Sequence, residues 1–84
     1  MNPFHGKLLR DGQVVVDGID GRLTIDYTPT HTELWSGFFT VPAGQTVQLN
    51  DRFDLVLDDG RTGKIRIERV NVTGQGSFAS FAAA

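Results

Sequence analysis

The fold is decided by residues 11–28, which read DGQVVVDGIDGRLTIDYT. In the second half of this stretch, Leu23, Ile25 and Tyr27 alternate with polar residues. A period of two is typical of a β-strand that buries one face. Helices are disfavoured throughout, because the chain contains ten glycines and each costs a helix interior about 1 kcal/mol relative to alanine. The sequence therefore predicts an all-β protein.

Turn residues divide the chain into short strands. Asp-Gly pairs stand at residues 11–12, 20–21 and 59–60, and this dipeptide suits the positive φ angles of two-residue type I′ hairpin turns. A glycine inside a strand often marks a bulge, so Asp17-Gly18 predicts a bulge within strand 13–19. Pro42-Ala43-Gly44 predicts a further turn.

About seven strands remain between these turns, among them a short strand at 46–49 and long strands at 32–41 and 61–73. Tight spacing leaves no room for crossover helices, and closure of the sheet removes unpaired edges. We therefore predict a small six- to seven-stranded antiparallel barrel or roll, rich in hairpins. Residues 1–84 are expected to form a single β-barrel domain, because a chain of this length builds only one core.

Composition restricts the classes of partner. Eight basic and ten acidic residues give a net charge of −2, which argues against nucleic-acid binding, since that binding depends on clustered cations. There is no cysteine. A membrane-spanning helix needs a run of about 18 apolar residues, and the sequence contains no such run. The N-terminus lacks the pattern of a signal peptide. We expect a cytoplasmic protein that binds neither nucleic acid nor membrane.

Strand 32–41 carries bulky apolar groups on both faces, namely Leu34, Trp35, Phe38 and Phe39. If Trp35 and Phe39 point into the core, Leu34 and Phe38 point outward. One interpretation is that the N-terminal segment or the chain end with Phe78 and Phe81 covers the outer face. The other is a protein interface formed by Leu34, Trp35 and Phe38, since aromatic anchors are enriched at interfaces.

Strand 61–73 changes its apolar face near Glu68-Arg69, which predicts a bulge there; the alternative is that Arg69 faces a pocket. The only basic concentration of the chain is Arg61, Lys64 and Arg66 in this strand, which Arg69 and Arg52 could extend. Charged residues can protect an exposed sheet edge, and they can also bind an anion or the phosphate of a nucleotide. Both interpretations stay open at this point.

No constellation of catalytic or metal-binding residues is recognisable. His5 and His31 are the only histidines, whereas zinc needs three or four ligands. None of the serines lies in a G-x-S-x-G elbow, and Gly60-Arg61-Thr62-Gly63-Lys64 lacks the spacing and the following helix of a P-loop. We predict that the chain is not an enzyme and binds no metal and no cofactor.

The segments 49–57, 64–70 and 77–81 together resemble the closing strands of PilZ-type barrels, a family that binds cyclic dinucleotides. The resemblance implies a nucleotide-sensing barrel, although the arginine-rich start and the (D/N)-x-S-x-x-G segment of that family have no match here. Phe38 and the DDGR turn at residues 58–61 are also similar to features of small bacterial β-barrel proteins.

Two functional hypotheses follow. The first is a non-enzymatic binding or assembly module that acts through the apolar strand face at Leu34, Trp35 and Phe38. Its partner would be another protein or a second copy of the chain, and a homodimer is the simplest form. The alternative is a PilZ-like sensor of a small anion or nucleotide, which would bind through Arg61, Lys64, Arg66 or Arg69.

Overall fold

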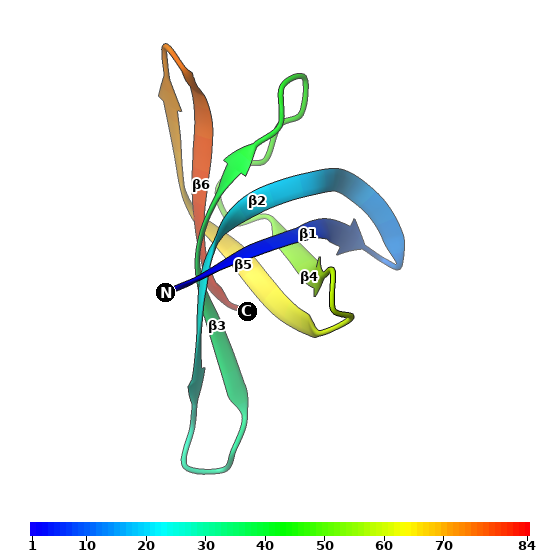
Figure 1. Cartoon of the computed structure of the whole chain (residues 1–84), viewed down its shortest axis with the longest axis vertical. Helices are drawn as coiled ribbons and strands as arrows, with labels where there is room; N and C mark the ends of the chain where they lie inside the picture. The colour runs from blue at the N-terminus through cyan, green and yellow to red at the C-terminus, as the bar shows by residue number, and fades with distance from the viewer.

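The computed structural model describes residues 1–84 and consists of six strands without a helix. Figure 1 shows the strands as labelled arrows. Their bounds are β1 Asn2–Arg10, β2 Gln13–Tyr27, β3 Glu33–Val41, β4 Arg52–Leu57, β5 Thr62–Thr73 and β6 Gly76–Ala83.

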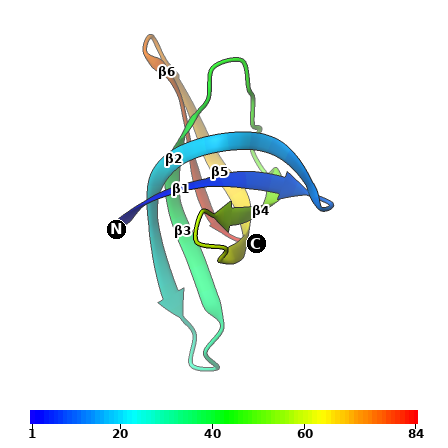
Figure 2. The same ribbon diagram turned by 45° about the vertical axis from the view of Figure 1, so that its right-hand side comes forward.

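The strands close into a barrel in the order β1-β2-β3-β6-β5-β4, with β4 pairing back onto β1. Every neighbouring pair is antiparallel. The predicted all-β antiparallel barrel is therefore confirmed, with six strands. Two hairpins, β2–β3 and β5–β6, extend beyond the barrel at opposite ends of its long axis (Figures 1 and 2).

β2 is one long strand, so the predicted turn at Asp20-Gly21 is wrong. Its first half pairs with β1 and its second half continues along β3. Gly21 is required for close approach and not for a turn. A Cβ atom placed there would lie 2.0 Å from the carbonyl oxygen of Phe38. A side chain at this position would therefore push β2 and β3 apart.

Two irregularities curve β2 over the barrel, as Figure 2 shows. The register with β1 shifts between Gly6 and Leu8, opposite Asp17-Gly18, and Gly18 has a φ of 67°. The predicted bulge at Asp17-Gly18 is therefore confirmed. A second shift leaves Val15 as an extra residue between Val14 and Val16. Bulges increase the local twist and bend of a strand, which explains the arch.

The two remaining Asp-Gly pairs, at residues 11–12 and 59–60, both lie in turns, but the turns are of different types. Asp11 and Gly12 have φ angles of 52° and 78°, as a type I′ turn requires. The β4–β5 hairpin is longer. The Gly60 N–H donates to the Leu57 carbonyl and the Leu57 N–H to the Arg61 carbonyl, and only Gly60 has positive φ there. This is a three-residue loop in which glycine takes the left-handed position.

The predicted strand 46–49 is also wrong, because local hydrogen bonds replace strand pairing there. The Gln48 N–H donates to the Asp51 carboxylate at 2.8 Å, and the Asp51 N–H donates to the Gln48 carbonyl at 3.1 Å. Asn50 between them has a φ of 69°. These contacts form a turn that ends directly before β4.

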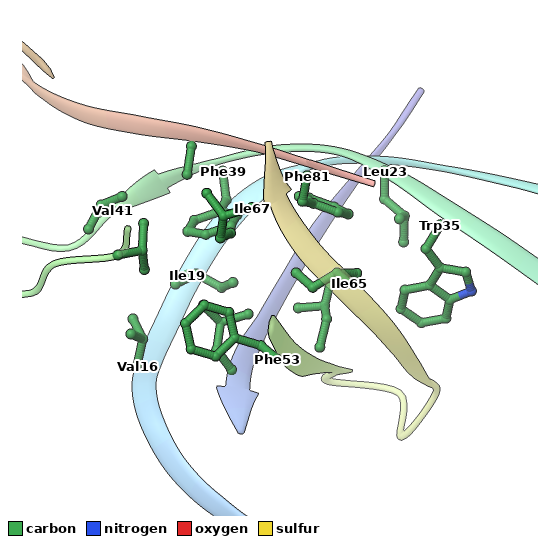
Figure 3. Packing of buried hydrophobic residues seen from close by; sticks show 14 of the residues in the cluster. Val16, Ile19, Leu23, Trp35, Phe39, Val41, Phe53, Ile65, Ile67 and Phe81 are labelled. Carbon is green, nitrogen blue, oxygen red and sulfur yellow. The ribbon is translucent and has the colours of Figure 1, made fainter. Parts of the chain in front are cut away.

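The core is one cluster to which all six strands contribute. Its largest buried side chains are Trp35 and Phe39 from β3, and Phe81 from β6 packs against Phe39 with ring centroids 6.0 Å apart. Figure 3 shows how these side chains converge with Ile19, Ile65 and their neighbours. Trp35 lies against Gly63 of β5, where a Cβ atom would be 2.3 Å from its ring.

Candidate functional site

The outer face of β3 and β6 differs from the rest of the surface because it carries no charge. Side chains alternate along both strands, so one set is buried and the other points outward. The outward set, named here the uncharged stripe, consists of Leu34, Ser36, Phe38 and Thr40 from β3 and Phe78, Ser80 and Ala82 from β6.

Two phenylalanines occupy the centre of the uncharged stripe. Phe38 is 41% exposed and pairs with Ser80, while Phe78 is 39% exposed and pairs with Thr40. The two rings are therefore diagonal neighbours on adjacent strands. Diagonal side chains on one face of a sheet lie within reach of each other when they are aromatic. Two exposed aromatic side chains therefore share this face at diagonal positions.

The three predicted interface residues divide between the two faces of β3. Leu34 and Phe38 point outward and are exposed. Trp35 is 2% exposed and belongs to the core, because it has the opposite parity on the strand. Its side chain therefore contributes to stability and not to the uncharged stripe.

Phe78 is the aromatic residue of the stripe that the sequence analysis did not assign to a site. One interpretation of the sequence is that the chain end with Phe78 and Phe81 covers the outer face of strand 32–41. Instead β6 pairs edge to edge with β3 and extends that face. Phe81 points inward and is buried, whereas Phe78 points outward. Only the pairing of β3 with β6 places Phe78 beside Phe38, and no local pattern signals a pairing between strands that far apart in sequence.

Charged residues lie on both sides of the uncharged stripe. On one side β2 presents Asp20, Arg22 and Asp26, and Arg22 pairs directly with Phe38. On the other side β5 presents Arg66, Glu68 and Arg69, and Arg69 pairs with Ser80. The β2 side has one excess carboxylate and the β5 side one excess guanidinium. The stripe thus separates an acidic flank from a basic flank.

The predicted bulge near Glu68-Arg69 is confirmed, since the β5–β6 register shifts between Ile67 and Arg69. Glu68 is the extra residue. The shift turns Arg69 to the outer face, where it is exposed, and brings Val70 to the inner side, where it packs against the core. The change of apolar face along this strand is therefore a bulge in the barrel wall.

The four predicted anion-binding residues do not converge. Arg61 lies in the β4–β5 turn, with its guanidinium Nε 2.9 Å from Asp59. Lys64 contacts Asp54 at 3.7 Å on the outer face. Arg66 lies two residues further along that face, with Glu68 at 3.9 Å, and Arg69 follows the bulge. The structure instead places Arg52 of β4 directly opposite Arg66.

The Arg61 contacts also affect a neighbouring carboxyl group. The Arg61 backbone N–H donates to Asp59 Oδ1 at 3.0 Å, and the guanidinium donates to Oδ2 at 2.9 Å. The backbone hydrogen bond first, and then the side-chain bond and the positive charge, lower the pKa of Asp59 from its ordinary value of 3.8. Arg61 is therefore occupied by a local contact in the turn.

The histidines and serines are dispersed. His5 Nδ1 lies 2.8 Å from Asp58 Oδ2 on the exposed surface, and His31 lies in the β2–β3 turn with a φ of 64°. Ser36 and Ser80 belong to the uncharged stripe. No group of three or more histidine or carboxylate side chains lies close enough together to hold a metal ion.

Comparisons with known proteins do not place the chain in a family. No family model, no curated protein and no solved structure matches it. The PilZ-type resemblance thus stays a prediction. The chain also has no helix that is long and apolar enough to cross a bilayer. Functional conclusions therefore depend on the surface described above.

Proposed function

We propose that this protein is a non-enzymatic assembly module that self-associates through the uncharged stripe. The observation that carries the proposal is the exposed pair Phe38 and Phe78 at the centre of a face without charges. Aromatic residues are enriched and charged residues depleted at the cores of protein interfaces. The small serines and Ala82 beside the rings let another flat surface approach closely.

A second copy of the chain fits this face because the flank on β2 is acidic and the flank on β5 is basic. A two-fold axis parallel to the strands would place β2 of one copy over β5 of its partner. Asp20 and Asp26 would then lie along the flank that carries Arg66 and Arg69. They would lie on either side of the row in which Arg22 meets the partner's Arg69. Closed two-fold dimers use the same patch on both subunits, and the opposite excess charges of the flanks meet that requirement.

The size of the face predicts a weak dimer. The outward side of β3 from Leu34 to Thr40 spans about 20 Å, and the four strands from β2 to β5 span about 15 Å. The product of these two lengths, ~300 Å², is well below the ~800 Å² of surface that each partner buries in a standard interface. We therefore expect a dissociation constant in the micromolar range or weaker.

Sedimentation velocity from 10 µM to 1 mM tests the proposal. The sedimentation coefficient should rise with concentration for the native chain, and Phe38→Asp should abolish the rise, because it buries a charge in the dimer. Leu49→Asp is the matched control, since Leu49 is an exposed leucine in the loop before β4. A native chain that remains monomeric over this range, or equal effects of both variants, would refute self-association through the stripe.

A further inference from the structure

Arg52 and Arg66 form an unusual like-charge pair on the outer face of the barrel. They are direct cross-strand partners on β4 and β5. Both have outward parity, because Phe53 and Ile65 beside them are buried. Like charges directly opposite each other on a sheet repel and destabilise the pairing. A sheet that keeps such a pair needs a compensating negative charge.

The protein supplies little of that compensation itself. Arg52 has no carboxylate within 4.0 Å, and Arg66 has only Glu68 at 3.9 Å. The Nε atom of Arg66 is buried and has no hydrogen-bond acceptor. Arg10 and Arg61, in contrast, lie closer to carboxylates, at 3.5 Å from Asp51 and 2.9 Å from Asp59. Arg52 therefore has no ion-pair partner and Arg66 only a distant one, and Arg69 on the same face of β5 also has none.

The backbone holds this arrangement in place. The turn before β4 ends at Asp51, and two hydrogen bonds tie it to β5: the Asn50 N–H donates to the Ile67 carbonyl at 2.8 Å, and the Ile67 N–H donates to the Asp51 carbonyl at 2.8 Å. Both lie next to the Arg52–Arg66 pair. The opposition of residues Arg52 and Arg66 therefore follows from a fixed register and not from a flexible loop.

The surface beside Arg52 has space for a ligand. A hollow of about 240 Å³ is lined by Arg10, Arg52 and Lys64, together with Asp11 and Asp54, and Arg66 lies outside its lining. On the other side, Arg66 pairs with Ala82 of β6, and its side chain is 41% exposed although its Nε is buried. On the outer face of β4 and β5, four cations (Arg52, Lys64, Arg66 and Arg69) exceed two carboxylates (Asp54 and Glu68).

We propose that Arg52 and Arg66 together bind the phosphate group of a small ligand. A phosphate carries about two negative charges near neutral pH, so it would neutralise both guanidinium groups, whereas a carboxylate would leave one uncompensated. The planar fork of arginine also matches phosphate oxygens in pairs. This site lies outside the uncharged stripe. It differs from the anion site predicted from the sequence, which included four basic residues, because it consists of one cross-strand pair.

An NMR titration of the ¹⁵N-labelled full chain with inorganic diphosphate, at constant ionic strength, tests the site. Shifts should concentrate at Arg52, Arg66 and their neighbours. Arg52→Gln and Arg66→Gln should each weaken binding at least tenfold. Arg61→Gln makes the same chemical change in the same hairpin at an arginine already paired with Asp59, and it should change the affinity less than twofold. Melting curves followed by circular dichroism verify that each variant is folded.

Two further probes define the ligand class. Phenyl phosphate distinguishes a phosphate monoester from free diphosphate as the source of the group, and binding of either at the arginine pair supports the proposal. Citrate carries comparable charge on carboxylates and should bind at least tenfold more weakly. Equal binding of citrate and diphosphate, shifts spread over all basic residues, or equal losses in Arg52→Gln and Arg61→Gln would overturn the proposal.

Discussion

Phe39 and Phe38 are consecutive residues of the same type on β3, yet they lie in opposite environments. Phe39 is fully buried and packs against Phe81. Phe38 is exposed between Arg22 on β2 and Ser80 on β6. Because successive side chains of a strand point to opposite faces, one phenylalanine stabilises the barrel while its neighbour is available for contacts. The role of each phenylalanine follows from its odd or even position along β3 and not from its residue type.

The same contrast holds for the two sides of the barrel wall. The inner side is apolar on every strand. The outer side carries charges on β1, β2, β4 and β5, but none on the stripe formed by β3 and β6. A charged outer face opposes association. The uncharged stripe is therefore where the barrel departs from an ordinary solvated surface.

The largest effect should separate the two phenylalanines. Phe39→Ala removes a fully buried ring and should lower the free energy of unfolding by about 3–5 kcal/mol. Phe38→Ala removes a half-exposed ring and should lower it by less than about 1 kcal/mol. Urea denaturation of both variants measures the difference. Equal losses would mean that the outer ring is as important for stability as the inner one, and the contrast between the faces would fail.

A smaller effect should separate two glycines. Gly21→Ala would place a Cβ atom against the carbonyl of Phe38, so the two strands must move apart, which we expect to cost about 1–3 kcal/mol. Gly74→Ala in the β5–β6 turn meets no atom within 4 Å and needs no positive φ, so it should be neutral or slightly stabilising. Thermal unfolding of the two variants checks this, and a tolerated Gly21→Ala would contradict the close approach.

The smallest effect concerns Asp59 in the exposed β4–β5 turn. Its lowered pKa means that the carboxylate stabilises the fold fully above pH 3.8, and that this contribution is lost as the pH falls through the lowered value. A carbon-detected NMR titration should show Asp59 titrating below 3.8. In Arg61→Gln the pKa should rise only part of the way back, since the backbone hydrogen bond remains. If the native Asp59 titrates at or above 3.8, the Arg61 contacts do not lower its pKa.

Local patterns of the sequence were sufficient for the strand interiors and for several turns. Leu23 and Ile67 are buried as their parity predicts, and Asp11-Gly12 forms the predicted turn because its φ angles depend only on the two residues themselves. The bulges at Gly18 and Glu68 were also visible, one as a glycine within a strand and one as a change of apolar face. Each of these signals is carried by residues that are close in sequence.

The errors arose where distant strands decide the outcome. Asp20-Gly21 has the composition of a turn, but β3 lies so close to β2 that Gly21 is needed for contact between backbones. Residues 46–49 have the composition of a strand, but they pair with no strand, and the Gln48–Asp51 contacts close a turn instead. Propensity describes what a segment can form, and pairing partners select among those possibilities.

The class of the fold follows from local sequence patterns, because glycine spacing and two-residue alternation leave a short chain no other way to bury its aromatic residues. The candidate sites, in contrast, depend on which strands pair. The strand order β3-β6-β5-β4 sets Phe78 beside Phe38 and Arg52 opposite Arg66. These partners are 40 and 14 residues apart in the chain, and their proximity depends on which strand edges hydrogen-bond to each other.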